Sequence, residues 1–278
     1  MFFLTLFGVC APILSAALWL TAFLLGCKAS ALWILPIALL LFCCFMLVYA
    51  VCISIPSFFV RKEMPKKISP FHKFISVQTL QIVLAFTHTR IRLKGKELLP
   101  NEPFILVSNH RSAIDALASF AAFSKHKFAF IAKAPVIEYP IIGPYISKCG
   151  VLGIERDKPL QSLRVINHAA KLIKEQGMSF GIYPEGTRTK TGRVGPFKSG
   201  AFLAAKKANV PVVVITTEGT ETFWKRIPFG RPRITLTVRA IISAEEVSLS
   251  TPEELAEKAR EQIVNALGEG NAEQSIQA

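Results

Sequence analysis

The stretch FILVSNHRSAIDALASFAAF, residues 104–123, contains the pattern that decides the fold. Phe104–Ser108 is a short apolar run, and Ala113–Phe123 carries apolar residues at helical spacing. A short apolar run bounded by turn-forming residues is typical of a buried strand, and apolar residues three or four apart are typical of an amphipathic helix. The stretch therefore predicts a strand, a polar loop and a helix in that order.

The same alternation continues toward the C-terminus. Apolar runs and helical patterns follow one another, which favours an α/β domain with a mostly parallel central sheet flanked by helices. The last helix has its own start and stop signals, with Thr251 as the cap, Pro252 at the first position and Gly268 at the end. The expected strands are Phe104–Ser108, Phe128–Ala132, Val151–Ile154, Ser179–Tyr183, Val210–Thr217 and Arg233–Ala240, and the expected helices are Ala113–Phe123, Leu160–Gln176, Ser199–Ala208 and Pro252–Leu267.

The N-terminal part of the chain is almost free of charge. The 278 residues include 33 Lys and Arg against 19 Asp and Glu, a formal net charge of +14, yet 51% of the residues are hydrophobic. Before Arg61 the charged side chains are limited to Lys28. This segregation excludes a disordered chain and a small disulfide scaffold. It predicts a membrane-attached segment followed by one globular domain.

Two uncharged runs, Phe2–Gly26 and Ala29–Val60, are each long enough to cross a bilayer, with a polar break at Cys27–Ser30 between them. We therefore expect a membrane helical hairpin. A cleaved signal peptide is the alternative for the first run, but that run lacks a basic leading region. A basic cluster follows the second run, so the positive-inside rule places the globular domain in the cytoplasm, attached to the cytoplasmic membrane. The cluster comprises Arg61, Lys62, Lys66 and Lys67.

The next segment, Ile68–Leu84, has apolar residues at helical spacing and basic residues at its start. Such a helix either packs against its own domain or lies at the lipid surface. The expected organisation is two membrane helices over residues 1–60, a basic amphipathic connecting helix over 61–92 and an α/β domain over 93–278.

His110 and Asp115 form the first candidate site, at the junction of the strand and the helix. Ser112 and Asp115 have the spacing of a capping box, which places Asp115 in the first helical turn and His110 in the preceding loop. From that loop the imidazole can fold back onto the carboxylate. A carboxylate on one ring nitrogen fixes the tautomer and leaves the other nitrogen to accept a proton from a hydroxyl. The alternative is a helix cap beside an ordinary loop histidine.

Two further loops follow apolar strands. In Gly181–Arg188, Gly186 allows a close approach of the backbone to a ligand, and Arg188 offers a guanidinium for phosphate. Glu185 reads more readily as a carboxylate that holds the loop than as a catalyst. In Gly153–Lys158, Arg156 is a candidate either for phosphate binding or for a surface ion pair.

Other chemistries lack their motifs. The sequence contains no phosphate-binding loop and no dinucleotide fingerprint. Its cysteines and histidines show no metal-ligand spacing, so we expect no metal site. The net positive charge would suit a nucleic-acid partner, but the sequence contains no nucleic-acid recognition motif.

Together these motifs resemble the glycerolipid acyltransferase family, in particular the 1-acyl-sn-glycerol-3-phosphate (lysophosphatidate) acyltransferases. Asn109, His110 and Asp115 match the first family motif, and Tyr183–Arg188 matches the aromatic-Pro-Glu-Gly-Thr-Arg motif, with Tyr183 in place of the usual Phe. Gly150–Arg156 matches the motif in which Arg follows a strand. The segment from Val210 to Ile215 has the first proline of the fourth motif and lacks the second.

The resemblance implies acyl transfer from acyl-CoA or acyl carrier protein to the free hydroxyl of lysophosphatidate, without a metal or redox cofactor. His110 would be the general base and Asp115 would orient it. The implied partners are the phospholipid membrane and these substrates, and not nucleic acid. The residues implied in substrate binding are Arg156, Glu185, Gly186, Thr187, Arg188 and Lys133.

Two alternatives remain open at this point. In the first alternative, the enzyme acylates another lysolipid or glycerol 3-phosphate. In the second, the protein is a non-catalytic binder of anionic membranes. The second alternative predicts that His110 is dispensable.

Overall fold

The computed structural model describes most of the chain, in eight stretches. Arg156 and the turn expected at Cys27–Ser30 lie outside them, as do three of the four residues of the basic cluster. The described stretches are residues 2–24, 34–59, 64–65, 67–140, 142–155, 157–188, 193–227 and 229–268.

Within these stretches the strands form one sheet in the order β1-β7-β6-β2-β5-β3-β4. Every neighbouring pair is parallel except β6 and β7, so the expected α/β fold with a mostly parallel sheet is confirmed. The strands are β1 (Arg90–Lys94), β2 (Ile105–Ser108), β3 (Phe128–Lys133), β4 (Leu152–Ile154), β5 (Ser179–Ile182), β6 (Val212–Glu218) and β7 (Arg233–Ile242).

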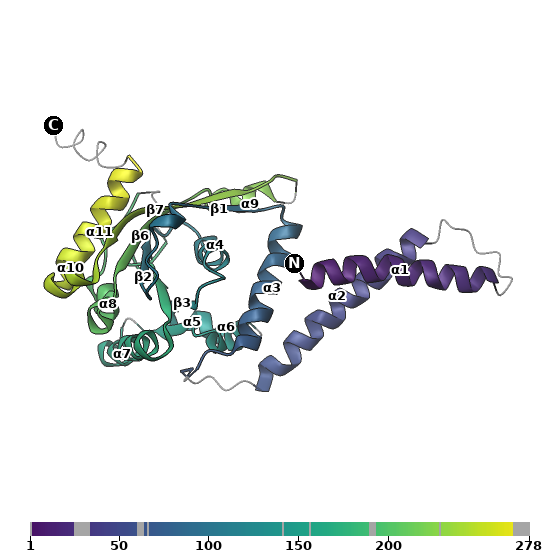
Figure 1. Ribbon diagram of the computed structural model, residues 1–278, viewed down its shortest axis with the longest axis horizontal. Helices are drawn as coiled ribbons and strands as arrows, with labels where there is room; N and C mark the ends of the chain where they lie inside the picture. The colour runs from purple at the N-terminus through teal and green to yellow at the C-terminus, as the bar shows by residue number, and fades with distance from the viewer. Residues whose placement is uncertain are drawn as a thin grey trace.

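Helices cover both faces of the sheet (Figure 1). One layer contains α7 (Pro159–Gln176), α8 (Leu203–Ala208), α10 (Ala244–Leu249) and α11 (Pro252–Ala266). The other contains α4 (Ile114–Ala122), with α3 (Pro70–Phe86) and α6 (Ile142–Lys148) packed beyond it. The shorter elements are η2 (Lys96–Leu98), α5 (Ala134–Glu138), η3 (Ser199–Phe202) and α9 (Phe223–Arg226).

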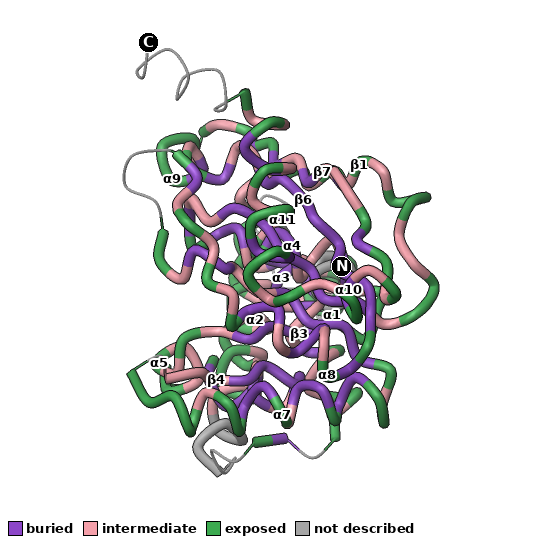
Figure 2. The backbone as a smooth tube through the Cα atoms, turned by 90° about the vertical axis from the view of Figure 1, so that its left-hand side faces the viewer, coloured by how far each residue is buried: buried purple, intermediate pink, exposed green. Residues whose placement is uncertain are grey.

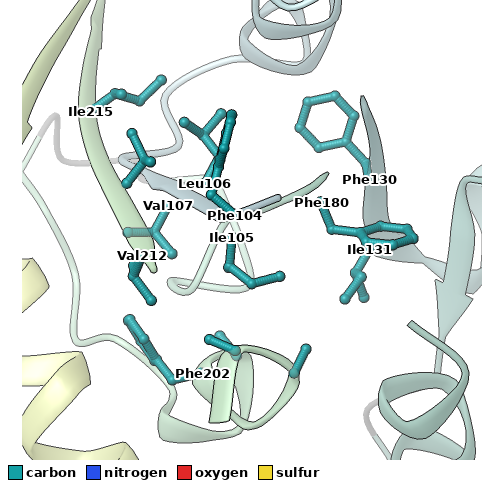
Figure 3. Packing of buried hydrophobic residues seen from close by; sticks show 14 of the residues in the cluster. Phe104, Ile105, Leu106, Val107, Phe130, Ile131, Phe180, Phe202, Val212 and Ile215 are labelled. Atoms are coloured by element: carbon teal, nitrogen blue, oxygen red, sulfur yellow. The ribbon is translucent and has the colours of Figure 1, made fainter. Parts of the chain in front are cut away.

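The core lies on the central strands. All four residues of β2 are buried, as expected for a strand covered on both faces. Phe104, Phe180 and Phe202 are among the largest side chains that are fully buried, and Figure 3 shows how they pack with β2 and β6. Figure 2 shows the buried backbone running through the middle of the domain, with exposed residues gathered around it. This rigid centre holds the loops at the carboxyl ends of the strands.

Six of the described elements were not expected from the sequence: β1, η2, α5, α6, α9 and α10. The strand β1 straddles the predicted domain boundary at residue 93 and pairs in parallel with β7. Its residues alternate between exposed and half-buried, and Arg90, Arg92 and Lys94 take the exposed positions, so no apolar run marks the strand. Proline is the second residue of the short helix α5 and the third residue of α6. Because proline usually interrupts a helix, the sequence does not predict a helix at either place.

The N-terminal helices α1 (Phe2–Leu24) and α2 (Ile34–Phe59) pack against each other and project from one side of the domain (Figure 1). Among the described residues, Leu35–Ser54 is long and apolar enough to cross a membrane, and Val9–Leu24 is a shorter apolar helix. The amphipathic helix α3 begins where Ser69 caps it, with Pro70 in the first turn. One face of α3 packs on α4 and α6, while Phe71, Phe74, Val83 and Phe86 remain exposed.

Candidate active site

The loop that carries His110 is fixed to the neighbouring strand β6 by Asn109. The Asn109 amide donates to the carbonyl oxygen of Thr217 (2.9 Å) and accepts from the Thr217 N–H (2.8 Å). The hydroxyls of Ser108 and Thr217 also meet, at 3.0 Å. Because these three residues are buried, the chain leaves β2 in a fixed direction.

Asp115 orients the imidazole of His110. The side chain of Asp115 is fully buried, and its Oδ2 lies 2.9 Å from Nδ1 of His110. The same oxygen accepts from the backbone N–H groups of Arg111 and Ser112, both at 2.8 Å, and the other oxygen accepts from the Thr220 hydroxyl. A carboxylate that accepts all four donors at a helix N-terminus is held in one position.

The expected helix start is confirmed in part. Asp115 lies in the first turn of α4, and its carboxylate accepts from the Ser112 N–H, which is one half of a capping box. The Ser112 hydroxyl accepts from Ile114 N–H (3.3 Å) instead of from Asp115 N–H. The carboxylate therefore serves the helix and the histidine together.

This geometry determines what His110 can do. With Asp115 as the acceptor, Nδ1 carries the proton and Nε2 presents a lone pair. The His110 side chain keeps 19% of its surface exposed, so a hydroxyl group can reach it. The arrangement can accept a proton from a bound alcohol.

Glu185 connects the loops on either side of the site. Its Oε1 accepts from the backbone N–H of His110 (2.7 Å), and its Oε2 accepts from that of Gly195 (3.1 Å). The residue is 8% exposed. These contacts favour the interpretation of Glu185 as a carboxylate that holds the loops in place.

We expect Glu185→Gln to destabilise the protein, because the new amide nitrogen faces a backbone N–H that has lost its acceptor. A lost hydrogen bond to a charged group costs about 1.5–3 kcal/mol. Thermal unfolding in detergent measures the loss as a lower melting temperature. The matched control is Glu175→Gln on α7, whose carboxylate is 59% exposed. Equal melting temperatures for the two variants would contradict this role.

A stack of aromatic rings supports the imidazole from one side. The Tyr183 ring lies against His110 with a centroid distance of 4.4 Å and an interplanar angle of 20°. Tyr183 also stacks on Phe130, with a centroid distance of 5.9 Å and an interplanar angle of 9°. Its hydroxyl lies 3.3 Å from that of Ser119 on α4. Burial, with a smaller contribution from the Asp115 charge, raises the pKa of Tyr183 well above its usual value, so the phenol stays neutral.

Gly181 makes room for this stack. A Cβ on residue 181 would lie 2.4 Å from Phe130 Cε1 and 2.8 Å from Phe128 Cζ. We expect Gly181→Ala to cost about 1–3 kcal/mol of stability, because overpacking displaces the rings. Gly200→Ala is the control, since nothing lies within 4 Å of the added methyl group. A melting temperature for Gly181→Ala as high as that of the control would show that the rings shift freely.

The other predicted substrate-binding residues lie around the same edge of the sheet. Gly186 adopts a φ of 77°, a conformation that favours glycine, and turns the chain toward the exposed Thr187 and Arg188. Lys133, also exposed, ends β3, which neighbours β5. Arg156 lies outside the described residues. The structure thus joins His110, Asp115 and Glu185 by direct contacts. It places the four other described residues at the rim of the site, namely Lys133, Gly186, Thr187 and Arg188.

Four residues of the site were not named as site residues from the sequence: Asn109, Thr217, Thr220 and Ser119. Thr217 and Thr220 lie at the carboxyl end of an apolar strand, which is the signal that could have identified them. Among the residues that the structure describes, no group of three or more His, Cys, Asp or Glu side chains is arranged to hold a metal ion.

Fold and site together define a class of protein: an α/β domain with an aspartate-oriented histidine at the carboxyl edge of its sheet, directly before a helix. The family model for Acyltransferase matches residues 90–218, which include His110, Asp115 and Glu185. This part of the chain is therefore an acyltransferase domain.

Named relatives agree with this assignment. The chain is 35% identical over 201 residues to the chloroplast 1-acyl-sn-glycerol-3-phosphate acyltransferases of Brassica napus and Arabidopsis thaliana. The match covers 71% of this chain but only 56% and 54% of those proteins, so the chain spans about half of their length. The crystal structure of the 1-acyl-sn-glycerophosphate acyltransferase PlsC from Thermotoga maritima shares the fold, with a TM-score of 0.58, 24% identity, and coverage of 81% of this chain and 89% of that one.

Proposed function

We propose that the protein transfers an acyl group from acyl-CoA or acyl carrier protein to the free hydroxyl of lysophosphatidate, giving phosphatidate. The observation that carries the proposal is the 2.9 Å contact between Asp115 and Nδ1 of His110, which leaves Nε2 for the acceptor hydroxyl. The activity named for the relatives supports the choice of acceptor. The acyltransferase domain supports the class of reaction.

In the proposed mechanism, Nε2 of His110 takes the proton of the acceptor hydroxyl while the oxygen attacks the thioester carbon. Asp115 stabilises the imidazolium that forms. The tetrahedral intermediate then collapses, the bond between carbon and sulfur breaks, and the leaving thiolate takes the proton back from His110. The products are the new ester and a free thiol, and no acyl-enzyme is formed.

The proposed phosphate site uses Arg156 and Arg188, with Lys133 nearby on β3. A guanidinium matches a phosphate through paired N–H donors. The support for Arg188 is its exposed position on the loop that Glu185 fixes beside His110. Glu185, Gly186 and Thr187 would shape that loop around the acceptor.

The proposed location is the cytoplasmic membrane, with the catalytic domain facing the cytoplasm. The apolar span Leu35–Ser54 supports attachment, since only 6% of it is buried inside the protein. A lipid acceptor is then supplied from the same bilayer that holds the enzyme. The exposed apolar face of α3 is consistent with contact at the membrane surface.

A panel of acceptors tests the proposal. The purified full chain in detergent receives labelled acyl-CoA or acyl carrier protein together with lysophosphatidate, glycerol 3-phosphate or a neutral lysolipid. We expect lysophosphatidate to give the highest kcat/KM. A preference for glycerol 3-phosphate or for another lysolipid would replace the proposed acceptor, and label transfer to none of them would reject the proposed activity.

A further inference from the structure

The connection between β6 and β7, residues 219–232, exposes two aromatic side chains. Trp224 on α9 is 69% exposed and Phe229 is 98% exposed. Exposed aromatic side chains that gather in one segment can mark a surface that contacts a partner or a lipid bilayer. We name residues 219–232 the β6–β7 loop.

The described residues around α9 turn Trp224 outward. Phe223 is 4% exposed and anchors α9 in the core, while the adjacent Trp224 points away, with the two rings edge to face at 5.2 Å. Gly219 turns the chain at a φ of 90°, and a Cβ there would lie 2.2 Å from the carbonyl oxygen of Arg233. The anchoring of Phe223 and the turn at Gly219 therefore keep Trp224 exposed.

Basic residues flank the two aromatic residues in the sequence. The β6–β7 loop contains Lys225, Arg226 and Arg231 and one acidic residue, Glu221, which precedes α9. All three cations are exposed. Exposed aromatic residues flanked by lysine and arginine match the interface of an anionic bilayer, where the rings insert at headgroup level and the cations meet lipid phosphates.

One end of the β6–β7 loop contacts the candidate site, and the other end contacts β1, the strand that follows α3. At one end of the loop, Thr220 donates its hydroxyl to Asp115. At the other end, the Pro232 carbonyl oxygen accepts from the Arg90 N–H (2.9 Å), which begins β1 shortly after the end of α3. Helix α3 contacts α1 and exposes Val83 and Phe86 near this end.

We propose that the β6–β7 loop docks on an anionic phospholipid surface through Trp224 and Phe229, with Lys225, Arg226 and Arg231 binding lipid phosphates. Trp224 follows Thr220 by four positions, so at most about 14 Å of backbone joins Trp224 to Thr220, the partner of Asp115. Docking therefore holds the His110 edge of the sheet at the membrane surface. The inference rests on the proposed membrane attachment, but it concerns the loop, and its test reads the loop separately.

The experiment uses the fluorescence of Trp224 in the full chain. Trp19→Phe and Trp33→Phe leave Trp224 as the sole tryptophan, since the chain has three. The protein is reconstituted into vesicles of phosphatidylcholine, with or without an equal part of phosphatidylglycerol, that carry a spin label at headgroup depth or at mid-bilayer depth. Flotation of the vesicles reports attachment of the whole chain, and quenching reports the position of Trp224.

We expect the emission of Trp224 to shift to the blue in the anionic vesicles, with at least ~2-fold stronger quenching by the shallow label than by the deep one. Replacing Lys225, Arg226 and Arg231 by Gln should weaken docking about fivefold for each cation removed. The control moves the reporter to α10, with Trp224→Phe and Leu249→Trp. Leu249 is 81% exposed and ends α10, which lies far from α1 and α2 in Figure 1, so the emission of a tryptophan at this position should stay unquenched.

Four outcomes would overturn the inference. A chain that floats with the vesicles while Trp224 remains unquenched rejects docking and leaves membrane attachment intact, whereas a chain that fails to float rejects both. Equal quenching at positions 224 and 249 indicates adsorption without a defined face. A Trp224 emission that shifts only when an acidic carrier protein is added assigns the loop to that partner instead.

Discussion

Replacing His110 with alanine is expected to lower the rate of acyl transfer at least ~100-fold, because the acceptor hydroxyl loses its base. The variant keeps the backbone contact from residue 110 to Glu185, so the loop should remain in place. The measurement is kcat with lysophosphatidate and acyl-CoA at saturating concentrations. Binding of lysophosphatidate should change little, since the proposed phosphate site does not include this side chain.

The His110→Ala result separates an enzyme from a non-catalytic membrane binder. His168→Ala is the matched control, because that imidazole contacts the carbonyl oxygen of Pro65 and lies on α7. We expect the control to retain its rate. A His110→Ala variant that remains folded and as active as the control would remove His110 from the mechanism.

Asp115→Asn is expected to lower the same rate at least ~100-fold while changing the stability little. The asparagine oxygen can still accept from the N–H groups of Arg111 and Ser112, and the new NH₂ can donate to the Thr220 hydroxyl, which is able to reverse its role. What is lost is the negative charge beside His110. A neutral amide stabilises the imidazolium poorly.

Asp115→Ala is the comparison that separates the loss of the negative charge from the loss of the hydrogen-bond acceptor. It removes the acceptor of buried donors, which costs about 1–3 kcal/mol for each group left unsatisfied. We therefore expect a clear drop in melting temperature for Asp115→Ala and almost none for Asp115→Asn, with both variants inactive. An active Asp115→Asn would mean that the carboxylate acts only as a structural acceptor.

The sequence predicted the parts of the fold and site that depend on local pattern. The strand β2 and helix α4 were expected because a buried strand and an amphipathic helix have different periods. The pairing of His110 with Asp115 was expected because both lie within one turn of the same helix start. Their functional interpretation came from the resemblance of the motifs to a known family.

Contacts between residues far apart in the sequence could not be predicted from local sequence patterns. The Glu185 carboxylate contacts the backbone of a residue 75 positions away, and the Thr220 hydroxyl contacts a carboxylate 105 positions away. Both depend on the order of strands in the sheet, which single-sequence patterns do not give. The strand β1 was missed because its exposed positions carry arginine and lysine and its inner positions are too few to form an apolar run.

The central claim is that His110 activates the hydroxyl of lysophosphatidate and not water. The most direct test measures free thiol released from acyl-CoA by the purified full chain, with and without lysophosphatidate, alongside His110→Ala. We predict thiol release that requires lysophosphatidate, equals the phosphatidate formed mole for mole, and falls at least ~100-fold in the variant. Thiol release at the same rate without the acceptor, or phosphatidate formation that survives the loss of His110, would contradict the account.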